Sequence, residues 1–141
     1  MILAIADSHP AYTLTMDIIP FRRKNKLAGI LLFGDSDNFS PKLTIPENTL
    51  KVKLDISNNG KGKCISSFEL PENSISHLKI VVNSFMAQLY INSTSACSFV
   101  MKSPVEFEDK PFAIFPDYLK KADVHVRNVF MKPRNLRNMQ M

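Results

Sequence analysis

The chain has 141 residues and a formal net charge of +5, and 45% of its residues are hydrophobic while 22% are charged. This length and composition predict one globular domain with a buried core and exclude a disordered chain. No apolar run reaches the roughly 18 residues that a membrane helix needs, and the first ten residues do not have the pattern of a signal peptide, so we expect no membrane partner.

Three segments in the first half of the chain have the patterns of β-strands. Residues 11–19 and 50–56 alternate between apolar and polar side chains, which predicts strands with one buried face. Residues 27–33 form a continuous apolar run of strand length, which predicts a central strand covered on both faces. The side chains expected to face the core are Tyr12, Leu14, Met16, Ile18, Leu50, Val52, Leu54 and Ile56.

The second half of the chain continues with short strands separated by polar turns. Further strands are predicted at 64–70, 77–82, 85–91, 96–101, 112–115 and 122–131, and one helical turn is predicted at 117–121. Nine or more strands at this even spacing predict an all-β fold, a concanavalin-like β-sandwich or jelly roll of two antiparallel sheets. We expect a single domain over residues 1–131 and a basic C-terminal tail over 132–141.

Two similar tetrapeptides, IPEN and LPEN, occur twenty-five residues apart, but the likeness stops after five residues. We therefore interpret them as similar turns instead of a repeat. Pro46 and Pro71 are each predicted to end a strand, and Asn48 and Asn73 are predicted to form the turn into the next one.

The sequence has no arrangement that indicates catalysis or metal binding. His9, His77 and His125 do not have the spacing of metal ligands, and the acidic segments 35–37 and 106–109 are interpreted as loops. No Gly-x-Ser-x-Gly motif occurs, and four glycines are too few for a phosphate-binding loop. We predict no catalytic residue, no metal and no cofactor in this chain.

The two cysteines, Cys64 and Cys97, are too few for a disulfide scaffold, so free thiols are favoured over a bridge and a cytoplasmic location is expected. Two glycosylation sequons begin at Asn38 and Asn92. If the sequons are used and the cysteines are bridged, the chain is secreted.

Residues 11–33 and the hairpin at 78–92 resemble the C-terminal β-sandwich of glycoside hydrolase family 32, the invertases and sucrose-6-phosphate hydrolases. In that family a strand like YTLTMDI is followed by one like AGILLF, and a later hairpin has the pattern Leu-x-Ile-x-Val-Asp, a serine turn and Glu-x-Phe-x-Asn. The corresponding residues here are Leu78, Ile80, Val82, Asn83, Ser84, Gln88, Tyr90 and Asn92. The resemblance covers about residues 11–131, with Asn83 and Gln88 where the family has Asp and Glu.

The resemblance implies that this chain is a non-catalytic accessory module. Catalytic residues of the family lie in an N-terminal five-bladed propeller, within Asn-Asp-Pro, Arg-Asp-Pro and Glu-Cys motifs that do not occur here. The parent protein is then expected to be a β-fructofuranosidase-type glycoside hydrolase that acts on sucrose or sucrose 6-phosphate. The propeller is the expected partner, and the isolated module should expose an apolar patch where it docks.

Two alternatives stay open. A free-standing lectin-like domain would bind carbohydrate through exposed rings and amides, for which the candidates are Tyr12, Gln88, Tyr90, Asn92 and Tyr118. An adaptor would bind protein or nucleic acid through the basic segment 21–26, which contains Arg22, Arg23, Lys24 and Lys26. That segment does not have the interleaved aromatic residues that stack on bases, so no nucleic-acid partner is expected.

Overall fold

The computed structural model describes residues 12–34, 39–57, 61–83, 85–101, 112–114 and 120–133, and in this part of the chain it contains eleven strands and no helix. The strands are β1 (Tyr12–Pro20), β2 (Ala28–Gly34), β3 (Phe39–Ile45), β4 (Lys53–Ile56), β5 (Gly62–Ile65), β6 (Ser76–Val82), β7 (Met86–Ile91), β8 (Thr94–Val100), β9 (Phe112–Ile114), β10 (Lys120–Lys121) and β11 (Val124–Pro133).

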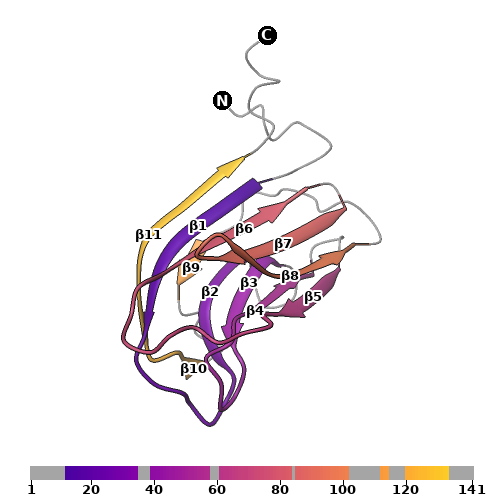
Figure 1. The fold of residues 1–141 in the computed structure, drawn as a ribbon. Coiled ribbons are helices and arrows are strands. Elements are labelled where there is room, and N and C mark those ends of the chain that lie inside the picture. The colour runs from indigo at the N-terminus through magenta and orange to yellow at the C-terminus, as the bar shows by residue number, and fades with distance from the viewer. Residues whose placement is uncertain are drawn as a thin grey trace.

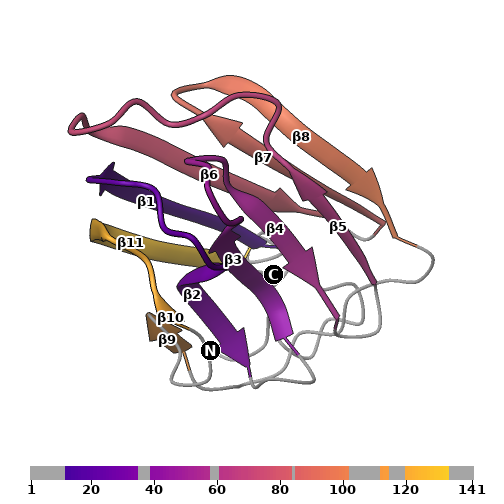
Figure 2. The same cartoon turned by 90° about the horizontal axis from the view of Figure 1, so that it is seen from below.

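The strands form two sheets that pack face to face (Figures 1 and 2). The five-stranded sheet has the order β11-β1-β6-β7-β8. The six-stranded sheet has the order β10-β2-β3-β4-β5, and β9 also pairs with β2. All described pairs are antiparallel except that of β10 with β2, which is parallel. The predicted β-sandwich is confirmed.

The core lies between the sheets and follows the alternation in the sequence. All four predicted inward side chains of β1 are at most 1% exposed, and all four predicted at 50–56 are at most 3% exposed. In β2, residues 28–32 are buried without alternation, as predicted for a central strand. Burial of this apolar area is the main stabilising contribution to a β-sandwich of this kind.

Strand β3 was missed by the sequence patterns, because Pro41 in its middle argues against a central strand. The structure nevertheless places β3 between β2 and β4. Six of its seven residues are buried, among them Ser40 and Thr44, so polar side chains in this strand do not mark an exposed face.

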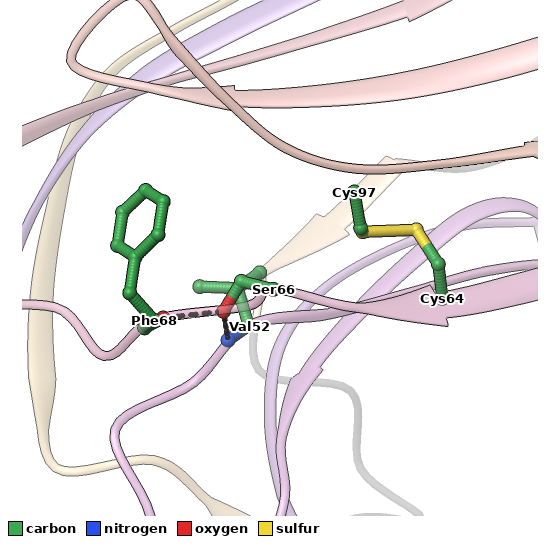
Figure 3. Close-up of a disulfide and its surroundings, with 5 residues drawn as sticks. All are labelled: Val52, Cys64, Ser66, Phe68 and Cys97. Carbon is green, nitrogen blue, oxygen red and sulfur yellow. Dashed lines mark hydrogen bonds between the residues drawn. A yellow bond between two sulfur atoms is a disulfide. The ribbon is translucent and has the colours of Figure 1, made fainter.

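The strand predicted at 64–70 ends earlier, at Ile65, because a side chain takes over the backbone hydrogen bonding there. The Ser66 hydroxyl accepts a hydrogen bond from the Val52 backbone N–H (3.0 Å) and donates one to the Phe68 carbonyl (2.8 Å), as Figure 3 shows. A serine that pairs with nearby backbone groups in this way competes with the sheet ladder. The chain therefore leaves the sheet after Ile65.

The predicted asparagine turns are present. Asn48 and Asn73 have left-handed φ values of 59° and 57°, a conformation that asparagine tolerates better than most residues. Their backbone N–H groups donate to the carbonyls of Lys24 and Pro20, respectively, and so hold the chain that leaves β1. β3 ends just before Pro46 as predicted, whereas no strand ends at Pro71.

The C-terminal boundaries differ from the prediction. β11 continues past residue 131, and its Lys132 and Pro133 pair with Thr13 and Tyr12. Of the predicted helical turn at 117–121, Lys120 and Lys121 form β10 instead, since they pair with Ala28 and Gly29, and residues 117–119 lie outside the described residues. In the described part of the chain, no helix is long and apolar enough to span a membrane.

Cys64 and Cys97 form a disulfide bond, which corrects the expectation of free thiols (Figure 3). Cys64 lies on β5 and Cys97 on β8, the edge strands of the two sheets, and their Cα atoms are 6.0 Å apart. Near the bridge, a Cβ atom at Gly62 would lie 2.2 Å from the ring of Phe99, so the two edges approach closely there. Sequence spacing could not reveal this pair, because it depends on how the sheets stack.

Candidate functional site

A groove of about 830 Å³ lies on the outward face of the five-stranded sheet. It is lined by alternate residues of four strands and by two residues that lie outside the strands. These residues are Thr13 and Thr15 of β1, His77, Lys79 and Val81 of β6 with the following Asn83, Gln88 and Tyr90 of β7, Ser93 of the next turn, and Phe130 and Lys132 of β11.

Strand register arranges most of these side chains in two rows across the sheet. One row runs Phe130, Thr15, Lys79 and Tyr90, since each pairs with its neighbour on the adjacent strand. The second row runs Lys132, Thr13, Val81 and Gln88 in the same way. Adjacent strands are about 4.8 Å apart, so each row spans about 14 Å. An aromatic ring thus lies at each end of the first row, with a hydroxyl and an ammonium group between them.

Two of the predicted carbohydrate-binding residues, Gln88 and Tyr90, line this groove. Both are half-buried members of β7. Their alternation with the buried Ala87, Leu89 and Ile91 directs them away from the core, as the sequence pattern indicated. Tyr118, a third candidate, lies outside the described residues.

Tyr12 does not lie in the groove, and its proposed role in sugar stacking needs correction. Its side chain is 1% exposed in the core, on the same face of β1 as Leu14 and Met16. Its hydroxyl is 2.8 Å from the Ser40 hydroxyl of β3, so the two form a buried hydrogen bond between the sheets. Burial raises the pKa of the Tyr12 hydroxyl far above its ordinary value. Tyr12 is therefore a structural residue.

Asn92 lies in the turn between β7 and β8 with a φ of 51°. Its side-chain Oδ1 accepts a hydrogen bond from the backbone N–H of His77 (2.8 Å), and its own backbone N–H donates to the His77 carbonyl (2.8 Å). The structure thus gives Asn92 a role in holding this turn against β6, beside Ser93 at the edge of the groove.

Several groove residues were not among the predicted site residues, notably Thr13, Thr15, Lys79, Phe130 and Lys132. A signal for them exists in the sequence, because Thr13 and Thr15 are the outward residues of the alternating strand at 11–19. What the pattern could not show is that β1 lies between β6 and β11, which brings these residues to one face.

Beside the groove, Asp17 accepts two hydrogen bonds that stabilise its charge. His77 Nδ1 donates to Asp17 Oδ1 (3.0 Å), and Asn128 Nδ2 donates to Asp17 Oδ2 (2.8 Å). The ladder between β1 and β11 is irregular opposite Met16, where Asn128 has a φ of 56°, and such a bulge redirects side chains. These contacts, first that of His77 and then that of Asn128, lower the pKa of Asp17 below its ordinary value.

We expect this arrangement to make stability depend on pH in the acidic range. A lowered pKa means that the folded chain favours the carboxylate, so the stabilisation is complete above the ordinary carboxyl pKa of about 4 and is lost as the pH falls further. Asp17→Asn should therefore show a shallower fall of Tm below pH 4 than the wild type, and should lower the unfolding free energy at pH 7 by about 1 kcal/mol. Thermal melts between pH 2 and pH 7 measure both; equal slopes for the two proteins would contradict the assignment.

The basic segment 21–26 is partly neutralised. Arg22 forms an ion pair with Asp123, and Arg23 forms one with Glu69, whose other carboxylate oxygen accepts a hydrogen bond from the Leu50 backbone N–H. The Arg23 guanidinium lowers the pKa of Glu69. Two of the four cations of the adaptor hypothesis thus take part in holding loops together.

Within the described ranges, no group of three or more histidine, cysteine, aspartate or glutamate side chains lies close enough to hold a metal ion. The acidic segments 35–37 and 106–109, which were predicted to be loops, lie outside the described residues. The absence of a cofactor stays a prediction.

No protein-family model matches the chain, and no curated protein matches it. Solved structures do. The chain is similar to galectin LEC-6 of Caenorhabditis elegans, at 16% identity over 89% of this chain and 84% of that chain, with a TM-score of 0.61. It is also similar to the carbohydrate-binding module CBM66 of Bacillus subtilis, at 19% identity over 90% and 78% of the two chains, with a TM-score of 0.60.

A third similar structure is the binding domain of botulinum neurotoxin DC in complex with SialylT. The identity is 12% over 87% of this chain, the TM-score is 0.65, and the match covers 32% of that chain. The chain therefore has the β-sandwich fold that a galectin and a carbohydrate-binding module share.

Proposed function

We propose that this chain is a carbohydrate-binding domain whose binding site is the groove on the five-stranded sheet. The observation that carries the proposal is the row of Phe130, Thr15, Lys79 and Tyr90, in which two rings flank hydrogen-bonding groups across the groove. Phe130 is 67% exposed, and the other residues that line the groove are mostly polar. A sugar matches such a surface, since its apolar face stacks on rings and its hydroxyls pair with amides and hydroxyl groups.

The dimensions of the groove support the same proposal. At about 830 Å³ it has the size of a small-molecule site, and the 14 Å between the ends of a row suits an oligosaccharide of two or three rings. The similar structures include a carbohydrate-binding module and a toxin domain in complex with SialylT, which makes a carbohydrate the first ligand class to test.

Phe130→Ala is expected to weaken oligosaccharide binding about tenfold, because a stacking ring of the groove is removed. Isothermal titration with the best ligands from a glycan array measures the effect. Phe85→Ala is the matched control, since Phe85 is 50% exposed but does not line the groove, and it should bind as the wild type does. Equal affinity of the two variants would place the binding site elsewhere, and an array without any ligand would contradict the proposed function.

A second candidate function is the accessory module of a family 32 glycoside hydrolase, which we propose on the basis of a separate surface. Phe85, Met86 and Val100 are 50%, 39% and 69% exposed, and they lie together because Met86 pairs with Val100 and Phe85 accepts a hydrogen bond from Met101. This apolar patch is of the kind that a docked catalytic domain covers. The same titration separates the two candidates, because a module that only braces a propeller releases no heat with any glycan.

A further inference from the structure

We propose that the groove selects carbohydrates that carry a negatively charged group, a carboxylate or a sulfate; this inference rests on the proposed carbohydrate-binding function. The groove is lined by two lysines, Lys79 and Lys132, and by no aspartate or glutamate among the described residues. Lysine side chains are cationic, so the described lining carries a net positive charge. An uncharged sugar would leave these charges without a partner.

Within the described part of the chain, the ammonium groups of the two lysines form no ion pair. The ion pairs found there join Arg22 to Asp123, Arg23 to Glu69, Lys53 to Asp55, and His77 to Asp17. Neither Lys79 nor Lys132 takes part in one. The acid nearest to them in the strand register is Asp17, and its two carboxylate oxygens already accept hydrogen bonds from His77 and Asn128.

The positions of the two lysines suit one anionic group between them. Lys79 lies on β6 and Lys132 on β11, on either side of β1, and they belong to different rows of the groove. Their Cα atoms are thus about 10 Å apart across the sheet and about 7 Å apart along it. The lysine side chains can reach toward a common point above β1, where the hydroxyls of Thr13 and Thr15 add two hydrogen-bond donors.

A saccharide fits this groove better than a single-stranded nucleic acid does. Tyr90 and Phe130 lie at opposite ends of a row about 14 Å long, with Thr15 and Lys79 between them, so they do not form a continuous stack for successive bases. Two lysines also make a short patch and not the extended positive track that follows a phosphate backbone.

The test compares matched ligands that differ in charge: lactose, 3′-sialyllactose, lactose 3′-sulfate, and tetragalacturonate with its methyl ester. Affinities of the wild type are measured by calorimetry at 50 mM and 300 mM salt. We expect at least one acidic ligand to bind about tenfold more tightly than its neutral counterpart at 50 mM salt, and this preference to shrink at 300 mM. The sialylated, galacturonate and sulfated arms distinguish a carboxylate from a sulfate as the recognised group.

The variants locate the preference on the two lysines. Lys79→Gln combined with Lys132→Gln should remove the preference for acidic ligands, so that acidic and neutral ligands bind with similar affinity, and Lys63→Gln, an exposed lysine of β5, should leave the preference unchanged. Equal affinity of the wild type for acidic and neutral ligands would overturn this inference alone, and so would a loss of the preference for acidic ligands in Lys63→Gln. A single-stranded oligonucleotide that binds more tightly than every acidic glycan would also overturn it. If no ligand of either charge binds, the proposed carbohydrate-binding function fails as well.

Discussion

Replacing both bridged cysteines, Cys64→Ser with Cys97→Ser, is expected to lower the free energy of unfolding by about 3 to 4 kcal/mol. The bridge closes a loop with a sequence separation of 33 residues, and the loss of such a closure increases the entropy of the unfolded chain by about this amount. It also joins the edge strands β5 and β8, which the backbone ladder of neither sheet connects. Urea denaturation, followed by circular dichroism, measures the change as a lower midpoint.

The control for this prediction is a reductant. Dithiothreitol should lower the midpoint of the wild type and leave that of the double variant unchanged. A wild-type midpoint that does not respond to reduction would contradict the stabilising role of the bridge.

Because disulfides persist mainly in oxidising compartments, we also propose that the chain is secreted. Free thiols at both positions in protein taken from its natural source would contradict this location.

Truncating the buried tyrosine, Tyr12→Ala, is expected to cost about 3 to 5 kcal/mol, because the side chain is 1% exposed and a cavity would remain between the sheets. Tyr12→Phe keeps the ring and should cost about 1 kcal/mol, since only the hydrogen bond to Ser40 is lost. Oligosaccharide affinity of Tyr12→Phe should equal that of the wild type.

The matched control is Tyr90→Phe, which also removes a tyrosine hydroxyl, but from the groove instead of the core. Its unfolding free energy should stay within about 0.5 kcal/mol of the wild type, because Tyr90 is half-buried on the outward face. Tyr12→Phe should therefore lower the unfolding free energy without changing affinity, whereas Tyr90→Phe should leave the unfolding free energy nearly unchanged. A loss of oligosaccharide binding in Tyr12→Phe without a loss of stability would indicate that Tyr12 belongs to the binding site.

The strand alternation alone determined the fold class and the orientation of many side chains. In β1 and at 50–56 every predicted inward residue is buried, because a strand directs successive side chains to opposite faces and water excludes the apolar ones. Gln88 and Tyr90 could be predicted for the same reason, since they alternate with the buried residues of β7. Tyr12 shows the limit of choosing site residues by type, because the same alternation that predicts its strand places it in the core.

Only the tertiary structure decided which strands become neighbours, and the groove and the disulfide depend on that order. Thr15, Lys79 and Phe130 are separated by tens of residues, and they meet because β1 pairs with both β6 and β11. Cys64 and Cys97 meet because β5 and β8 are edges of stacked sheets. The side-chain period of a strand is a local property of the backbone, whereas sheet order results from the packing of the whole core, which no single segment of the sequence encodes.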